Sequence, residues 1–195
     1  MIDSHCHLKF IKNSGSVDEL VAAAANAGVH TIVNIGTDLD SSRESVELAS
    51  KFAGVYAAVG VHPHDASTLT DASFSKLKEL SNRNRVVAIG EIGLDYYRDL
   101  SPRDIQKKAF VRQLEFAVER KLPVVIHTRD SFDDTIEIVR DFAPNLSGGI
   151  FHCFQGDLRD AEQVFALGFH ISVNGIITYK NSGMSRLAAE APLEK

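Results

Sequence analysis

The run Val124-Val125-Ile126-His127 is the clearest indication of the fold, because it joins a short series of β-branched residues to a terminal histidine. β-branched residues favour strands, and a wholly apolar run is typical of a strand that is buried on both faces. Similar runs recur along the whole chain, each followed by a loop and then by helical sequence. The runs cover residues 1–7, 31–37, 55–62, 86–91, 123–127, 149–152 and 169–174.

The segments between these runs begin like helices. Ser16 with Glu19 and Ser41 with Glu44 both fit the capping-box pattern, in which two side chains bond the free amides of the first turn. Asp157 is a suitable cap for the stretch that ends near residue 167. Strands that alternate with helices over the full length predict parallel βαβ units.

Parallel strands of this number form either an open doubly wound sheet or a barrel. The open sheet would be expected to carry a glycine-rich phosphate-binding turn after an early strand, and the sequence contains no such motif. A barrel instead places functional residues at the carboxyl ends of many strands. Polar residues stand at the ends of the runs: His7, Asn34, His62, Glu91, His127, His152 and Asn174. We therefore predict an α/β fold of the TIM-barrel type with about seven parallel strands, forming one domain over residues 1–195.

Composition excludes other classes of protein. The 195 residues are 44% hydrophobic and 24% charged, as in globular proteins with a sizeable core. No run approaches the roughly 18 apolar residues of a membrane span, and the first residues do not resemble a secretory signal, so we expect a cytoplasmic protein. The two cysteines provide no disulfide framework. A net charge of −5 argues against a general nucleic-acid binder, although bound divalent cations would reverse that charge locally.

Histidines and one carboxylate form a candidate metal site. His5 and His7 are two residues apart, so both imidazoles lie on the same face of a strand. His127 and His152 end consecutive strands at the same rim of the barrel. Glu91 continues the buried stripe of the strand before them, where a carboxylate needs a cation, a hydrogen-bond network or a proton.

Each of these motifs alone is more often structural, since a single strand-terminal histidine commonly serves as a hydrogen-bonded core residue. Their combination argues against coincidence. Together they exceed what one ion takes from a protein while keeping a position open for substrate. We therefore predict two divalent ions, Mg²⁺, Mn²⁺ or Zn²⁺, that share Glu91 and clamp the oxygens of a phosphodiester.

Two further residues are assigned to catalysis. His62 ends the third run within residues 60–64, and Arg129 follows the fifth run. A guanidinium binds phosphate through two parallel hydrogen bonds, so we expect Arg129, together with His62, to orient the substrate phosphate. Tyr96 and Tyr97 follow the fourth run, where aromatic rings can stack on nucleic-acid bases.

Five motifs follow one another along the chain: Ile2-Asp3-Ser4-His5-Cys6-His7-Leu8, Gly60-Val61-His62-Pro63-His64, Gly90-Glu91-Ile92-Gly93-Leu94-Asp95-Tyr96, His127-Thr128-Arg129-Asp130 and His152-Cys153-Phe154. Their order and spacing resemble the TatD-type metal-dependent deoxyribonucleases, a family of amidohydrolase-like barrels. The resemblance implies that His5 and His7 bind one ion, that Glu91 bridges it to a second, and that His127 and His152 are ligands of the second ion. It also implies hydrolysis of DNA, or of RNA, from the 3′ end of single strands.

Family chains continue past a segment like residues 191–195 into an eighth strand with a metal-binding aspartate, so this sequence is expected to be a fragment, incomplete at the C-terminus. Two other interpretations remain open. One is an amidohydrolase-type enzyme that cleaves C–N or ester bonds, in which a lysine often takes the position of Glu91. The other is a catalytically impaired metal-binding fragment that a partner chain completes.

Overall fold

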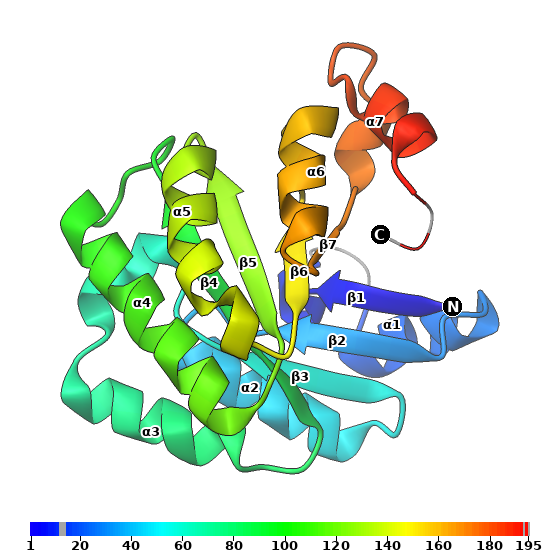
Figure 1. Ribbon diagram of the computed structural model, residues 1–195. Helices are drawn as coiled ribbons and strands as arrows, with labels where there is room; N and C mark the ends of the chain where they lie inside the picture. Colours follow the sequence, from blue (N-terminus) through cyan, green and yellow to red (C-terminus); the bar gives the residue numbers. More distant parts are fainter. Residues whose placement is uncertain (12–14, 193, 195) are drawn as a thin grey trace.

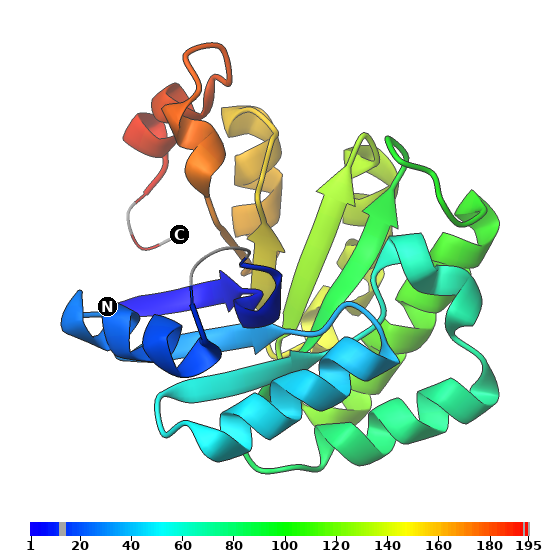
Figure 2. The same cartoon turned by 180° about the vertical axis from the view of Figure 1, so that it is seen from behind.

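A parallel sheet forms the frame of the computed structural model, which describes residues 1–11, 15–192 and 194. The strands lie in chain order from β1 to β7, and the sheet curls while helices cover its outer side (Figures 1 and 2). This confirms the predicted barrel-type sheet with its seven parallel strands. The strands are β1 (Ile2–Cys6), β2 (Thr31–Ile35), β3 (Val55–Val59), β4 (Val86–Asp95), β5 (Val124–Arg129), β6 (Gly149–His152) and β7 (His170–Ile171).

Helices connect successive strands, and their first residues follow from local capping. Ser16 and Asp157 cap their helices as predicted. The predicted capping box at Ser41 is wrong, because Asp38 is the cap and its carboxylate accepts the amide of Ser41 at 2.7 Å. The α-helices are α1 (Val17–Asn26), α2 (Leu39–Lys51), α3 (Asp71–Ser81), α4 (Arg103–Arg120), α5 (Phe132–Phe142), α6 (Leu158–Ala166) and α7 (Met184–Glu190). Short 3-10 turns are η1 (Leu8–Phe10), η2 (Pro63–Thr68), η3 (Ala143–Asn145) and η4 (Gly175–Thr178). No helix in the described part of the chain is long and apolar enough to cross a membrane.

The fourth strand is longer than predicted, and this extension shapes the site. β4 continues four residues beyond Glu91 to Asp95 and pairs with β5 along its whole outer part. Gly93 permits this approach, because a Cβ at that position would collide with the carbonyl oxygen of His127.

The seventh strand is shorter than predicted. β7 contains only His170 and Ile171 of the predicted strand 169–174, and Asn174 caps η4 instead of ending a strand.

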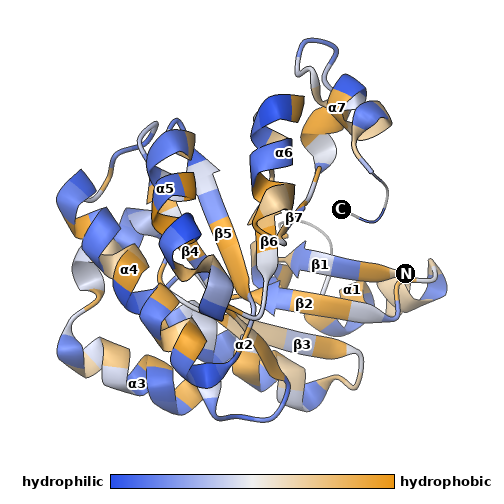
Figure 3. Cartoon of the chain, in the orientation of Figure 1, coloured by the Kyte–Doolittle hydropathy of each residue, from blue (hydrophilic) through white to orange (hydrophobic). Residues whose placement is uncertain are grey.

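The hydrophobic core lies between the sheet and the helices that cover it. Figure 3 shows the hydrophobic colour concentrated on β2, β3 and β5, with hydrophilic colour on the outer sides of the helices. Phe110 and Leu114 of α4 are almost completely buried, and they belong to one cluster with Ile92 of β4 and Ile126 of β5. Burial of such side chains contributes about 1.5–3 kcal/mol each, so the strands that carry the site have a rigid support.

Substitution of Leu114 by alanine is expected to lower the free energy of unfolding by about 2–5 kcal/mol, because it removes apolar contacts and leaves a cavity against the sheet. Leu114 is fully buried. Leu100, which is 67% exposed, provides the matched control, and its alanine variant should stay within about 0.5 kcal/mol of the wild type. Urea unfolding of both variants measures the difference, and equal losses would contradict this account of the core.

Candidate metal centre

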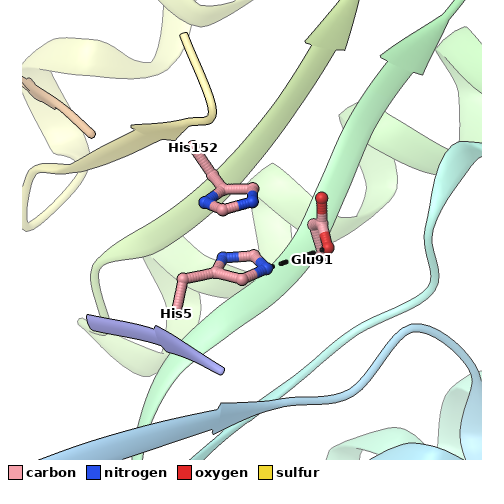
Figure 4. A group of neighbouring side chains, drawn as sticks. All are labelled: His5, Glu91 and His152. Carbon is pink, nitrogen blue, oxygen red and sulfur yellow. Dashed lines mark ion pairs between the residues drawn. The ribbon is translucent and has the colours of Figure 1, made fainter. Parts of the chain in front are cut away.

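Side chains from distant strands converge on the carboxylate of Glu91. His5, Glu91 and His152 present ligand atoms within 4.8 Å of one another, and so do His62, Glu91 and His127. Figure 4 shows the rings of His5 and His152 lying parallel beside Glu91, with centroids 3.2 Å apart. The sheet therefore brings the predicted residues together at one rim, and Glu91 belongs to both groups.

Glu91 presents its two oxygens to different histidines. Oε2 lies 3.4 Å from Nε2 of His5 and 3.8 Å from Nε2 of His7. Oε1 lies 3.0 Å from Nδ1 of His127 and 3.8 Å from Nε2 of His62. Burial would raise the pKa of Glu91, but hydrogen bonds from His127 and His5 outweigh it and hold this pKa well below its usual range. Glu91 is thus a buried anion between two sets of nitrogen atoms.

Of the first two histidines, His7 has the tautomer that metal ligation requires. It donates from Nδ1 to the carbonyl oxygen of Ile35 at 3.1 Å, so its lone pair lies on Nε2. This Nε2 faces Nε2 of His5 at a hydrogen-bond distance of 3.1 Å. His5 Nδ1 is buried and has no hydrogen-bond partner among the described residues. Burial also lowers the pKa of His7 and so favours its neutral form.

His127 and His152 differ in their surroundings. Burial and the nearby His5 lower the pKa of His152 to about 3, and its Nδ1 lies 3.3 Å from the hydroxyl oxygen of Ser172. Burial would also lower the pKa of His127, but hydrogen bonds to Asp95 and Glu91 outweigh burial and raise it to about 9. His127 therefore bridges two carboxylates, whereas His152 is a neutral imidazole.

His62 is also buried, and its hydrogen bonding identifies its tautomer. The backbone amide of His64 donates to Nδ1 of His62 at 3.1 Å, so Nδ1 carries the lone pair. Burial lowers the pKa of His62 to about 3, so the ring is neutral and its proton resides on Nε2. That N–H is directed toward Glu91, with Nε2 3.8 Å from Oε1. In this tautomer His62 presents an N–H group, and not a lone pair, to the site.

The carboxylate of Asp95 is an element of the site that our sequence-based assignment of functional residues missed. Asp95 is 1% exposed, and its Oδ2 lies 2.9 Å from Nε2 of His64 and 3.0 Å from Nε2 of His127. The spacing could have revealed it, because residues four apart on a strand share a face and Asp95 follows Glu91 by four. The prediction ended the strand at Glu91 and so left Asp95 in a loop.

Arg129 lies at the rim of the centre, where it helps to line a cavity of about 210 Å³. Its guanidinium carbon is 3.8 Å from the ring centroid of Tyr97, which is 59% exposed. Tyr96 has a structural position instead, because its hydroxyl donates to Asp134 at 2.6 Å. The cavity is lined by His7, His62, Glu91, His127, Thr128, Arg129, His152, Cys153 and Gln155.

This donor set fits divalent cations. Nε2 of His5 and Nε2 of His7 lie 3.1 Å apart beside one oxygen of Glu91, and the other oxygen of Glu91 faces His127. Imidazole nitrogens and carboxylate oxygens are ligands that Zn²⁺ and Mn²⁺ accept. A cation between these groups would bind the imidazole lone pairs and pair with the charge of Glu91.

A curled parallel sheet whose strand ends direct several histidines at one carboxylate is the framework of a metal-dependent hydrolase of the barrel type. The profile of the family described as TatD related DNase matches residues 2–195. The chain belongs to this family.

Relatives and solved structures agree with this assignment. An uncharacterized metal-dependent hydrolase, YabD, of Bacillus subtilis is 37% identical over 93% of this chain and 71% of its own length. A 3′-5′ ssDNA/RNA exonuclease TatD of Cronobacter sakazakii is 36% identical over 86% of this chain and 64% of its own length. The crystal structure of YJJV, a TatD homolog of Escherichia coli, superposes with a TM-score of 0.90 at 33% identity, and covers 98% of this chain and 75% of that one. The chain thus spans about two thirds of the length of these relatives.

Proposed function

We propose that the centre around Glu91 hydrolyses phosphodiester bonds of nucleic acid as a dinuclear metal-dependent exonuclease that removes nucleotides from the 3′ end of single strands. The observation that carries the proposal is the division of the Glu91 carboxylate, with Oε2 facing His5 and His7 and Oε1 facing His127. A shared carboxylate between two sets of nitrogen ligands suits a pair of cations. The name of the Cronobacter sakazakii relative supports the choice of substrate and polarity.

The residues that would hold the cations are Glu91 with His5, His7 and His152 on one side and Glu91 with His127 on the other. This differs from the predicted pairing of His152 with His127, because the ligand atom of His152 groups with those of His5 and Glu91. Bound divalent cations supply the positive charge that polarises a phosphodiester and acidifies water. The cations would also offset the negative charge of the chain near the substrate. Arg129 alone would offset only part of that charge.

The phosphate is best placed in the cavity that Arg129 lines together with the histidines. A larger adjoining cavity of about 610 Å³ shares Thr128, Arg129 and Gln155 with it. Four aspartates line that second cavity, and Arg129 is the one cation among its described lining residues. The second cavity therefore carries net negative charge and repels a phosphate. We assign Arg129 and the Nε2–H of His62 to the non-bridging oxygens of the scissile phosphate, where they would stabilise developing charge.

Cleavage of labelled oligonucleotides tests this function directly. The 195-residue chain is incubated with Mn²⁺ or Mg²⁺ and with single strands that carry a label at either the 5′ or the 3′ end. A 5′-labelled strand should shorten stepwise, whereas a 3′-labelled strand should release its label first. Internal cleavage, or hydrolysis of a small amide without release of nucleotides, would contradict the proposal.

Substitution of His62 by glutamine is expected to lower kcat by about 10²-fold while the bound metal content stays the same, because His62 donates to charge that develops in the transition state. Measuring metal content beside kinetics separates this role from ligation. His30 is exposed and lies outside the centre, so His30→Gln serves as the control with wild-type activity. Loss of one equivalent of metal from His62→Gln would instead identify His62 as a ligand.

A further inference from the structure

Asp95 uses both of its oxygens, and it uses them for different parts of the site. Oδ2 accepts from Nε2 of His64 at 2.9 Å and from Nε2 of His127 at 3.0 Å. Oδ1 accepts the backbone amides of Tyr97 at 3.0 Å and Arg98 at 2.7 Å. One buried carboxylate therefore contacts two imidazoles and the start of the loop after β4.

The contact with His127 determines which ring nitrogen faces the metal centre. An ionised carboxylate only accepts hydrogen bonds, so Nε2 of His127 must carry a proton. Nδ1 is then the nitrogen that faces the centre: it donates to Oε1 of Glu91 at 3.0 Å, and a cation bound there would take the place of that proton. Histidines that bind metals usually donate their other N–H to a carboxylate or carbonyl group in this way, which fixes both tautomer and ring orientation.

The contact with the loop fixes a second group at the rim. Tyr97, whose amide Asp95 holds, lies 3.8 Å from the guanidinium of Arg129. The main chain of Asp95 is itself anchored, because its amide donates to Oε1 of Gln106 at 2.9 Å and its carbonyl accepts from Nε2 of Gln106 at 3.2 Å. The carboxylate is therefore held in place independently of the groups that it positions.

We propose that Asp95 is a positioning residue that couples the two parts of the site: Oδ2 makes His127 offer Nδ1 to the cation shared with Glu91, and Oδ1 fixes the loop that carries Tyr97 beside Arg129. The inference rests on the proposed metal centre. It concerns protonation and order that can be measured without substrate, so its failure is distinguishable from failure of the nuclease assay.

Substitution of Asp95 by asparagine separates the two roles. The amide oxygen can still accept the amides of Tyr97 and Arg98, while the NH₂ group then faces the imidazoles as a donor. Nε2 of His127 must then act as an acceptor, so the one proton of the neutral ring stays on Nδ1, where it opposes ligation of a cation. Affinity for Mn²⁺ at one of the two sites should fall by about 10–100-fold. Asp95→Ala, in contrast, should also release the loop.

Three measurements follow from this argument. Nitrogen NMR of the metal-free protein should show Nε2 of His127 protonated in the wild type and unprotonated in Asp95→Asn. Calorimetric titration with Mn²⁺ should show the loss of affinity. Hydrogen exchange at the amides of Tyr97 and Arg98 should stay slow in Asp95→Asn and become fast in Asp95→Ala. Asp99→Asn, in the same loop but paired with Arg103, is the matched control and should behave like the wild type.

An unchanged tautomer and unchanged Mn²⁺ affinity in Asp95→Asn would overturn the proposal. A measurement on the wild type covers the case in which the variant does not fold. With an NMR-active cadmium isotope as the metal, coupling is expected to Nδ1 of His127 and not to Nε2. Coupling to Nε2 would show that Asp95 does not direct the ligating nitrogen.

Discussion

Replacing Glu91 by glutamine should lower metal-dependent cleavage by about 10³-fold or more, because the carboxylate that both metal groups share is lost. Stabilisation of the transition-state charge by bound metal ions is worth several kcal/mol. Each Glu91 oxygen faces its own set of nitrogen atoms, so no neighbouring carboxylate occupies an equivalent position. Steady-state kinetics on a single-stranded oligonucleotide provide the measurement, together with metal content after dialysis.

The control for this variant is Glu119→Gln on the exposed side of α4, where the carboxylate pairs with Lys78 at the surface. It should keep wild-type activity and metal content. If Glu91→Gln retained full activity at saturating Mn²⁺, Glu91 would not be the shared ligand, and the proposed dinuclear centre would be wrong.

Removal of divalent cations should abolish cleavage and also lower thermal stability. A cation that binds only the folded state stabilises it by about 2.7 kcal/mol at a concentration 100 times its Kd. For a chain of this length, that corresponds to a rise in Tm of about 5–10 °C over the chelated protein. The imidazoles of His5 and His7, whose Nε2 atoms lie 3.1 Å apart beside Glu91, are among the groups that a cation would hold.

Thermal unfolding with chelator and with added Mn²⁺ measures this effect, and Glu91→Gln serves as the internal reference because it should show little shift. An equal shift in wild type and variant would mean that the cation stabilises the protein somewhere else. Activity that persists after exhaustive chelation would contradict a metal-dependent mechanism altogether.

The strand order and the main candidate ligands could be predicted from local sequence. A run such as residues 124–126 is apolar on both faces, which is typical of a buried parallel strand, and repetition of such runs with helices between them leaves few topologies. The carboxyl ends of such strands share one rim, so His127, His152 and Glu91 were expected to meet there, and the structure brings them together. His5 joins the same group from β1.

Other features depended on contacts between residues far apart in the chain. Whether β4 stops at Glu91 or continues to Asp95 is decided by pairing with β5, and Gly93 permits that pairing through its close approach to His127. In contrast, the cap of α2 was a local choice, because Asp38 accepts the amide of Ser41 and so starts the helix before Ser41 can act as its cap. Local patterns did not distinguish these alternatives, because both were compatible with the residue types.

Neighbouring residues in the chain specify the barrel-type sheet and the residue types at its rim, because strand periodicity and side-chain chemistry are local properties. The tautomer of each imidazole instead depends on contacts that only folding creates. His62 accepts the amide of His64 on Nδ1, whereas His127 donates from Nε2 to Asp95, and these opposite arrangements give the two rings different roles. A histidine has two nearly equivalent neutral tautomers, and only the partner that folding places beside each nitrogen selects between them.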